Sequence, residues 1–447
     1  MSDHRLSRRD FLTQTAIGAS AATLVPREVV GGPAYTPPSD KVRVGCIGIG
    51  GMGANDVRAV AALEETEIVA LCDVDRERGK EIFTAFSDAA QYEDYREMLS
   101  NESASLDAVT VSTPDHNHAP ATVRALRDGK HVFCQKPLTH TVAEARRVGQ
   151  VAEQASVATR MGIQHHADDG LRRLRELLEA GTIGTVQKIL VWTNRPIWPQ
   201  AMERPLEMYH EPDHLNWNLW LGPAPKRPYH PDYAPFNWRG WYAFGTGALG
   251  DIGCHALDGA FWSLQLDPPT RVRAETTPTY DETYPEASRI TYEFPGQGSS
   301  GGLELIWMDG NLRPPKPASW NGDEAWPPSG YNQLFIGDDG ALLFGAGETP
   351  RLLPKEKHEQ VMANPPKKKY SRSDGHYKAW IDACKAGTSP EANFADYSAP
   401  LTEFVLLGNL AVRAQRPIEW DASTGQITNG GDLNELLTKQ HREGWKL

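Results

Sequence analysis

The sequence has no excess of basic residues, since 46 Lys and Arg stand against 58 Asp and Glu and the formal net charge is -12. Proteins that bind nucleic acid through its phosphates need a basic surface, so no nucleic-acid partner is expected. No apolar run reaches the roughly 18 residues that a helix needs to cross a bilayer. We therefore predict no transmembrane segment in the mature protein.

Cysteine is also scarce. The five cysteines are odd in number and lack C-x-x-C spacing, so neither a disulfide framework nor a cysteine metal site is predicted. Cys46, Cys72 and Cys134 lie in apolar, strand-like runs, which favours buried free thiols. Low-complexity tracts and internal repeats are absent as well. The length of 447 residues then indicates two or three ordinary globular domains of about 100 to 200 residues each.

The first 40 residues are interpreted as a targeting segment followed by a linker. Ser7-Arg8-Arg9-Asp10-Phe11-Leu12 precedes a mildly apolar run over residues 13–25, and this pattern resembles a twin-arginine (Tat) export signal. The alternative is a chance Arg-Arg pair ahead of a short amphipathic helix. The signal predicts export by the Tat route and a periplasmic location.

From Lys41 onward, short apolar runs alternate with amphipathic stretches. Strands are predicted over residues 42–49, 67–72, 108–112 and 131–134. Helices are predicted over residues 54–63, 76–86 and 119–128, and a helix at 142–154 and a strand at 157–163 close the unit. Alternating strands and helices favour a parallel sheet with helices on both faces. The prediction is a Rossmann dinucleotide-binding domain over residues 41–165.

The character of the sequence changes after a predicted helix at residues 170–180. Residues 191–241 are rich in Pro and Trp, and alternating runs typical of antiparallel strands follow at residues 271–276, 289–294, 302–307 and 333–337. The last helices are predicted over residues 375–385, 398–414 and from 433 on. We predict a second, α+β domain over residues 166–447 with a mostly antiparallel open sheet, whose terminal helices are candidates to pack on the first domain.

Residues 48–53 fit the dinucleotide fingerprint G-x-G-x-x-G, follow an apolar strand and open a helix. Glycines permit a tight turn, so that the N–H groups of the helix N-terminus can hold a pyrophosphate. The predicted cofactor contacts in this turn are Gly48, Gly50, Gly51, Met52 and Gly53. The alternative is a glycine-rich turn that binds nothing.

Asp73 follows Gly53 by 20 residues, at the end of the next strand. Its carboxylate is placed to accept hydrogen bonds from the adenosine ribose and would repel a 2′-phosphate. NAD is therefore predicted in preference to NADP, although Arg76 and Arg78 leave NADP open.

Three further residues suggest proton chemistry. Lys136 follows a strand at the carboxyl edge, where open α/β sheets bind ligands. Asp251 and His255, four residues apart in a predicted helix, share one helix face. An amine, a carboxylate and an imidazole together can move a proton while hydride is transferred. A surface lysine, and a capped helix with a core histidine, are the alternatives, and spacing alone supports the two readings of the Asp-His pair equally.

These motifs occur in an order that resembles the Gfo/Idh/MocA oxidoreductases, named for glucose–fructose oxidoreductase and inositol dehydrogenase. The resemblance covers nearly everything after residue 40. It rests on residues 48–53, Ser112-Thr113-Pro114 with His118, Gly129-Lys130-His131, Cys134-Gln135-Lys136-Pro137 and residues 250–255. Residues 217–223 and 442–445 look like a long bacterial branch with exported members.

The resemblance implies that His255 is the acid/base, that Lys136 polarises or relays, and that Asp251 orients its neighbours. It also implies contacts to the cofactor or substrate from Ser112, Thr113, Pro114, His118, Trp238 and Arg239. One departure stands out, because the family's usual Glu is Gln135 here. Gln can still bond a ribose, but it removes a negative charge beside the lysine, which should ease deprotonation of Lys136.

Two other groups are candidates for the same cleft. Gln164, His165 and His166 follow a strand edge, but the two adjacent histidines point in different directions, so no metal site is predicted. The tryptophans of residues 191–241, Trp192 among them, can either stack on a sugar ring or pin the segment to the core.

The predicted function is an NAD(P)-dependent oxidoreductase that moves hydride between a sugar hydroxyl or ketone and a tightly bound nicotinamide. Since the Tat route carries folded proteins, the cofactor would be exported bound and regenerated in place. The alternatives are an NAD-dependent glycosidase or lyase that oxidises the sugar transiently, and a non-catalytic carbohydrate-binding protein. The family resemblance also implies that open sheet faces pair to give a homodimer or homotetramer.

Overall fold

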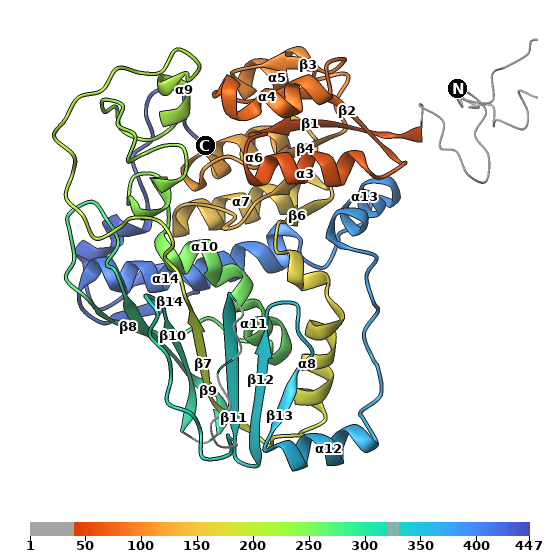
Figure 1. Cartoon of the computed structure of the whole chain (residues 1–447), viewed down its shortest axis with the longest axis vertical. Helices are drawn as coiled ribbons and strands as arrows, with labels where there is room; N and C mark the ends of the chain where they lie inside the picture. The colour runs from red at the N-terminus through yellow and green to blue at the C-terminus, as the bar shows by residue number, and fades with distance from the viewer. Residues whose placement is uncertain (1–39, 300, 321–325, 327–329) are drawn as a thin grey trace, which may run out of the picture. The chain divides into compact units, whose positions relative to one another are not determined.

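A six-stranded parallel sheet with strand order β3-β2-β1-β4-β5-β6 forms the first of the two sheets (Figure 1). The computed structural model describes residues 40–299, 301–320, 326 and 330–447, so the predicted export signal lies outside the described residues. The strands are β1 (Val42–Ile47), β2 (Thr66–Cys72), β3 (Ala90–Tyr92), β4 (Ala108–Val111), β5 (His131–Cys134) and β6 (Thr159–Met161). The order and direction confirm the predicted Rossmann fold.

Helices flank this sheet, which leaves its inner strands almost wholly buried. The helices are α3 (Met52–Ala61), α4 (Arg76–Ala85), α5 (Tyr95–Asn101), α6 (His118–Arg127) and α7 (Val142–Ala155). Double burial explains why β1, β4 and β5 appear in the sequence as continuous apolar runs. Sequence patterns missed β3, because its three residues at the sheet edge, Ala-Gln-Tyr, carry no apolar run.

The second sheet has nine strands in the order β13-β12-β11-β7-β10-β9-β8-β14-β15. They are β7 (Val186–Thr193), β8 (Arg271–Thr276), β9 (Ser288–Ser299), β10 (Gly302–Met308), β11 (Tyr331–Gly337), β12 (Gly340–Gly345), β13 (Arg351–Leu353), β14 (Ile418–Asp421) and β15 (Gln426–Ile427). All pairings are antiparallel except that of β7 with β10, which confirms the predicted mostly antiparallel sheet.

The remaining helices are α8 (Asp169–Glu179), α9 (Trp217–Leu221), α10 (Gly247–Ala256), α11 (Asp258–Leu264), α12 (Lys355–Ala363), α13 (His376–Ala386) and α14 (Ala399–Ala414). Near the C-terminus, α13 packs on α3 and β1, and α14 packs on α7. These contacts join the C-terminal part of the chain to the Rossmann sheet.

The two faces of the second sheet differ, as the two-residue period of a strand requires. In β7, Ile189 and Val191 belong to the core shared with the helices, whereas Leu190 and Trp192 pack with Trp320 on the opposite face. Farther along that opposite face the sheet carries ion pairs, with Lys188 Nζ 3.1 Å from Glu304 Oε2 and Arg273 Nη1 2.6 Å from Glu293 Oε1.

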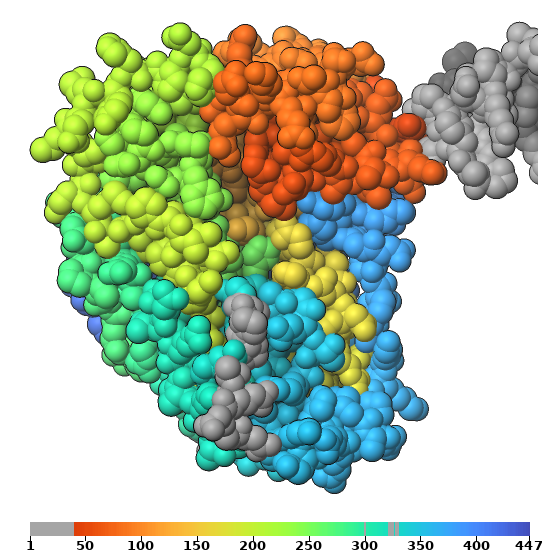
Figure 2. All heavy atoms as spheres, viewed as in Figure 1, coloured from red at the N-terminus to blue at the C-terminus, as the bar shows by residue number. Residues whose placement is uncertain are grey.

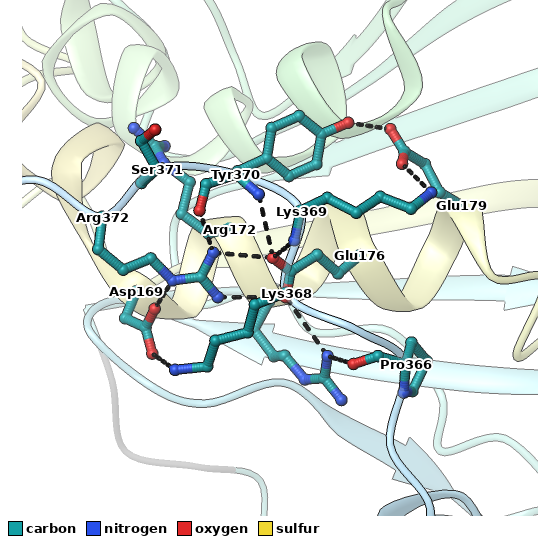
Figure 3. A network of polar contacts seen from close by, with 11 residues as sticks. Asp169, Arg172, Glu176, Glu179, Pro366, Lys368, Lys369, Tyr370, Ser371 and Arg372 are labelled. Atoms are coloured by element: carbon teal, nitrogen blue, oxygen red, sulfur yellow. Dashed lines mark hydrogen bonds and ion pairs between the residues drawn. The ribbon is translucent and has the colours of Figure 1, made fainter.

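A strap over residues 364–375 links α12 to α13 and runs along α8 (Figure 3). Glu176 of α8, whose side chain is fully buried, accepts hydrogen bonds from Arg372 Nη1 at 2.8 Å and Nη2 at 3.1 Å. The same carboxylate accepts the backbone N–H of Lys369 at 2.8 Å. The strap is therefore fixed to α8 immediately before α13 begins.

All five cysteines are buried and free, which confirms the prediction made for Cys46, Cys72 and Cys134. Among the described residues, no helix is both long and apolar enough to span a membrane.

Candidate active site

A cavity lies at the carboxyl ends of the parallel strands, the edge at which open α/β sheets bind ligands. In Figure 2 it is the hollow between the orange atoms of the Rossmann domain and the yellow-green atoms of residues 194–246, a segment inserted between β7 and α10. The site residues that were predicted from the sequence and that line this cavity are Gly48, Gly50, Gly51, Met52, Asp73, Ser112, Thr113, Pro114, His118, Gln135, Lys136, Trp238, Arg239 and Asp251. The structure thus brings most of the predicted site residues together.

The glycine turn forms a narrow cradle at one end of this cavity. Gly48 and Gly51 have positive φ angles of 76° and 56°. A Cβ at Gly53 would lie 1.9 Å from the carbonyl oxygen of Gly48, so no larger residue fits there. No side chain caps the first N–H groups of α3, which leaves them for an anion. The cradle therefore fits the pyrophosphate of a dinucleotide.

Asp73 has a role beyond the predicted one. Its Oδ2 accepts the backbone N–H groups of Ile49 at 2.8 Å and Gly50 at 3.1 Å, so the carboxylate braces the glycine turn. Burial raises the pKa of Asp73, against the effect of these N–H donors. Of the two nearby arginines, Arg78 lies over the turn, since a Cβ at Gly51 would be 3.1 Å from its Nη2. Arg76 instead pairs with Glu93.

A buried carboxylate, Asp56 of α3, lies beneath the cavity and was not predicted. It accepts hydrogen bonds from Ser112 Oγ at 2.6 Å, Gln135 Nε2 at 3.0 Å and Tyr377 Oη at 2.6 Å. Burial raises its pKa, although these donors oppose the effect. A Glu at position 135 would place a second carboxylate against Asp56, so the geometry accounts for the amide found there.

Lys136, Arg239 and Arg195 converge on one carboxylate, Asp251 of α10. Lys136 Nζ donates to the Asp251 carbonyl at 2.6 Å and to Oδ1 at 3.2 Å, and Arg239 Nε donates to Oδ1 at 3.0 Å. Arg195 Nε lies 3.7 Å from Oδ2. Burial opposes ionisation of Asp251, but Lys136 and Arg239 outweigh it and lower its pKa to about 2. Asp251 is thus ionised at neutral pH, and sequence reasoning missed Arg195.

His255 follows Asp251 by one turn of α10, as its spacing predicted. Its Nδ1 is buried and has no hydrogen-bond partner among the described residues. Burial and the charge of Lys136 hold the pKa of His255 well below the ordinary value, so the imidazole is neutral at neutral pH. The ring of His165 lies 6.1 Å away, centroid to centroid. A buried ring nitrogen without a partner is a position that a hydroxyl group can satisfy.

His118 lines the cavity, and its ring nitrogens contact backbone groups of the cavity wall. Its Nδ1 lies 2.7 Å from the Pro137 carbonyl oxygen and its Nε2 lies 2.8 Å from that of Thr113. Burial lowers the pKa of His118, but Cys134, Asp115 and the carbonyl groups raise it overall to about 9. Both nitrogens are therefore occupied by the chain that carries Lys136 and by the turn after β4.

Six predicted site residues are not among those that line the cavity: Gly53, Gln164, His165, His166, Trp192 and His255. His166 is fully buried, and its Nδ1 lies 2.9 Å from Oδ1 of Asp258. Trp192 packs against Trp326 on the opposite face of the second sheet, because side chains alternate along β7. The expectation that adjacent histidines point in different directions agrees with the exposure of His165 and the burial of His166.

Several tryptophans of the inserted segment share one apolar cluster, and two of them, Trp220 and Trp238, also line the cavity. Trp217 and Trp220 stack at 4.7 Å within a local apolar cluster. Trp238 and Trp198 instead flank Arg239, whose guanidinium carbon lies 4.2 Å and 5.7 Å from their ring centroids.

Two further parts of the chain complete the cavity: the inserted segment, whose Trp238 and Arg239 were predicted site residues, and the C-terminal tail, which was not predicted to contribute. The inserted segment bonds to the β2–α4 turn, since Asn216 donates its N–H to Val74 at 2.8 Å and Arg76 donates to His214 at 2.9 Å. From the C-terminal tail, Trp445 lines the cavity and lies under the guanidinium of Arg96, 4.1 Å from the ring centroid.

Two models of one family match the chain. Residues 42–163 match the one described as an oxidoreductase family with an NAD-binding Rossmann fold, and residues 170–316 match its C-terminal alpha/beta domain. Together the two matches cover more than half of the sequence, including the glycine turn, Lys136, Asp251 and His255.

Curated relatives agree with this assignment. Myo-inositol 2-dehydrogenase of Thermotoga maritima is 27% identical over 158 residues, which are 35% of this chain and 47% of the relative. The chain therefore spans about half the length of such relatives. The rhizopine catabolism protein MocA of Rhizobium meliloti is 26% identical over 313 residues, 68% of this chain and 82% of that protein.

A solved structure supports the fold over a longer span. The WlbA dehydrogenase of Bordetella pertussis, crystallised with NADH and UDP-GlcNAcA, superposes with a TM-score of 0.59. The match covers 85% of this chain and 99% of that one, at 18% identity. With the glycine cradle and the Lys136–Asp251 contact in one cavity, these matches show that the chain belongs to the Gfo/Idh/MocA oxidoreductase family.

Proposed function

We propose that this protein is an NAD-dependent oxidoreductase that acts on a sugar or sugar derivative. The observation that carries the proposal is that the glycine cradle and the Lys136–Asp251 pair line the same cavity. A dinucleotide whose pyrophosphate lies in the cradle needs its reactive end near the proton-transfer groups, and the fold supplies both at one sheet edge. The 2-dehydrogenase and MocA relatives support the substrate class.

Bound NAD supplies the acceptor or donor of hydride. The residues of the chain manage the proton of the substrate oxygen. Neutral His255 accepts the hydroxyl proton when the alcohol is oxidised and returns it when a ketone is reduced. Lys136, held by the carbonyl and carboxylate of Asp251, directs an N–H group at the same oxygen and stabilises its developing negative charge. Asp251 fixes the lysine and stays ionised.

NAD is the proposed form of the cofactor, with Asp73 as the selecting residue. The carboxylate disfavours a 2′-phosphate at the ribose, and its bonds to the glycine turn keep it in place. Arg78 lies beside the turn and limits how strong this preference is.

The cofactor is proposed to stay bound through turnover and export. The inserted segment and Trp445 border the cavity, and the backbone bonds at Val74 and Arg76 fix the insertion to the Rossmann domain. A Tat-exported enzyme in the periplasm would need such retention, because no free pool of the cofactor is expected there. Hydride taken from one sugar would then be returned to a second carbonyl compound, or to the same molecule.

The test is the nucleotide released when the purified protein is denatured, followed by single-turnover reduction of the bound nucleotide with a panel of sugars. NAD(H) in the released fraction and absorbance of reduced nicotinamide are the expected results. A glycoside cleaved without net redox change would favour the glycosidase alternative. Nucleotide that no sugar reduces would favour the binding protein.

A homodimer or homotetramer through one face of the second sheet is also proposed, from the family resemblance and because no helix of the described residues covers that face in Figure 1. The ion pairs of Lys188 and Arg273 on that face imply an interface with a polar part. The mass in solution by light scattering tests it, and a monomer would refute it.

A further inference from the structure

Three cations gather around Asp251 at the wall of the cavity, and two of them, Lys136 and Arg239, line it. Lys136, Arg195 and Arg239 all lie within 4 Å of a single carboxylate, Asp251. The four side chains are only 13% to 23% exposed, so water screens them incompletely. Within these contacts, three cations share one anion.

Two buried carboxylates lie close enough to act on this cluster, Asp115 on Lys136 and Arg239 and Asp56 on Lys136, but among the described residues neither forms an ion pair with the three cations. Asp115 is buried, bonds to Thr246 and faces the protonated ring of His118, which balances its charge. Asp168 pairs with His165. Asp56 lies below Gln135 with three donors of its own. Among the described residues, Asp251 is therefore the carboxylate that the three cations share.

Several N–H groups of this cluster remain available. Arg195 Nε is buried, lies too far from Asp251 for a hydrogen bond, and has no other partner among the described residues. Arg239 uses Nε on Asp251 and Nη1 on the Phe236 carbonyl, which leaves Nη2. Lys136 has a third N–H beyond its two bonds to Asp251.

Aromatic rings stand next to these donors. The guanidinium of Arg239 lies 4.6 Å from the ring centroid of Phe236, which lines the cavity and is partly exposed. An exposed ring beside a guanidinium suits a ligand that has an apolar ring face and an anionic group.

We propose that the substrate is an anionic sugar, whose carboxylate or phosphate is bound by Arg195 and Arg239. The proposal rests on the oxidoreductase function proposed above and specifies its substrate class. Guanidinium groups bind both kinds of oxyanion, and each charge-assisted hydrogen bond contributes roughly ten- to a hundredfold in affinity. The anion adds a second negative charge beside the three cations.

The experiment compares matched substrates on the nucleotide-loaded protein: several hexoses, the corresponding hexuronates and the hexose phosphates. We expect at least one anionic member to exceed its parent hexose about tenfold or more in kcat/KM. Preference for the uronate assigns a carboxylate, and preference for the phosphate ester assigns a phosphate. If the neutral hexose matches or exceeds both anions in every set, the proposal is overturned.

Variants test the assigned residues. Arg195→Gln should raise KM for the anionic sugar about tenfold more than it raises KM for the parent hexose, and Arg195→Lys should restore part of this difference. Arg416→Gln, a change at an exposed pair with Asp432 in the C-terminal region, is the matched control and should alter neither value. Equal KM changes for charged and neutral sugars in Arg195→Gln would overturn the assignment.

A measurement of sugar binding distinguishes failure of this inference from failure of the proposed function. If no sugar reduces the bound nucleotide, the oxidoreductase proposal fails, and the melting temperature of the loaded protein then decides the substrate class. A larger increase with an anionic sugar than with its parent hexose supports the inference. Equal increases, or none with any sugar, overturn it.

Discussion

Replacing Glu176 with Gln should release the strap of residues 364–375 from α8. The buried carboxylate accepts two bonds from Arg372, one from Arg173 at 3.3 Å, and the N–H of Lys369 (Figure 3). The amide of Gln is nearly the same size but has one acceptor oxygen and no charge. The variant therefore loses the ion pairs while the packing is kept.

The expected cost is about 3 kcal/mol, at the low end of the range for removing one member of a buried ion pair. The low end applies because Arg372 is one quarter exposed and water can solvate part of its released charge. If strap opening breaks these contacts, the same 3 kcal/mol corresponds to roughly a hundredfold larger open population.

Limited trypsin digestion reads this population, because Lys367, Lys368 and Lys369 are cleavage sites within the strap. Cleavage there should be about a hundredfold faster in Glu176→Gln when opening is faster than cutting. Amide hydrogen exchange at Lys369, whose N–H bonds to Glu176, is an independent measure. Asp432→Asn, which breaks an exposed pair with Arg416, should leave both rates unchanged.

The pH dependence of the unfolding free energy gives a second check on the role of Glu176. Burial opposes ionisation of Glu176, but Arg372 and the backbone donors outweigh it and lower its pKa from 4.5 to about 2. A depressed carboxyl pKa contributes stability that is present above pH 4.5 and is lost as the pH falls toward 2. The difference in unfolding free energy between wild type and Glu176→Gln should therefore narrow over that interval. Equal cleavage rates at neutral pH, with both proteins folded, would refute the reasoning.

Three further predictions concern the cavity. Lys136→Ala and His255→Ala should each slow single-turnover hydride transfer by about 10²- to 10⁴-fold at equal nucleotide occupancy, and near-normal rates would contradict the proposed roles. Asp251→Asn should lose less activity than either, because its backbone carbonyl still accepts from Lys136. Asp73→Ser should relax the preference for NAD over NADP in titrations of the nucleotide-free protein, and an unchanged preference would remove Asp73 as selector. Trp445→Ala should lose bound nucleotide during gel filtration, since the ring lines the cavity, and full retention would show that the tail does not hold it.

Local patterns in the sequence were enough to predict the architecture. The strands β1, β4 and β5 and the glycine turn depend on apolar runs and on backbone freedom within a few residues, so their signals are local. The i, i+4 spacing likewise placed Asp251 and His255 on one face of α10. The family resemblance added Lys136 and its relation to that pair.

Only the tertiary structure decided which charges meet. Asp56 and Tyr377 are 321 positions apart and meet where α13 returns to the Rossmann domain, and Gln135, which lies 79 positions from Asp56, donates to the same carboxylate. Arg195 reaches Asp251 because the inserted segment leaves the end of β7 at the cavity mouth, which no local period reveals. Trp192 was assigned to the substrate by composition, but the phase of β7 places it on the opposite face. Periodicity predicts which side chains share one face of a strand or helix. Long-range packing determines what that face contacts.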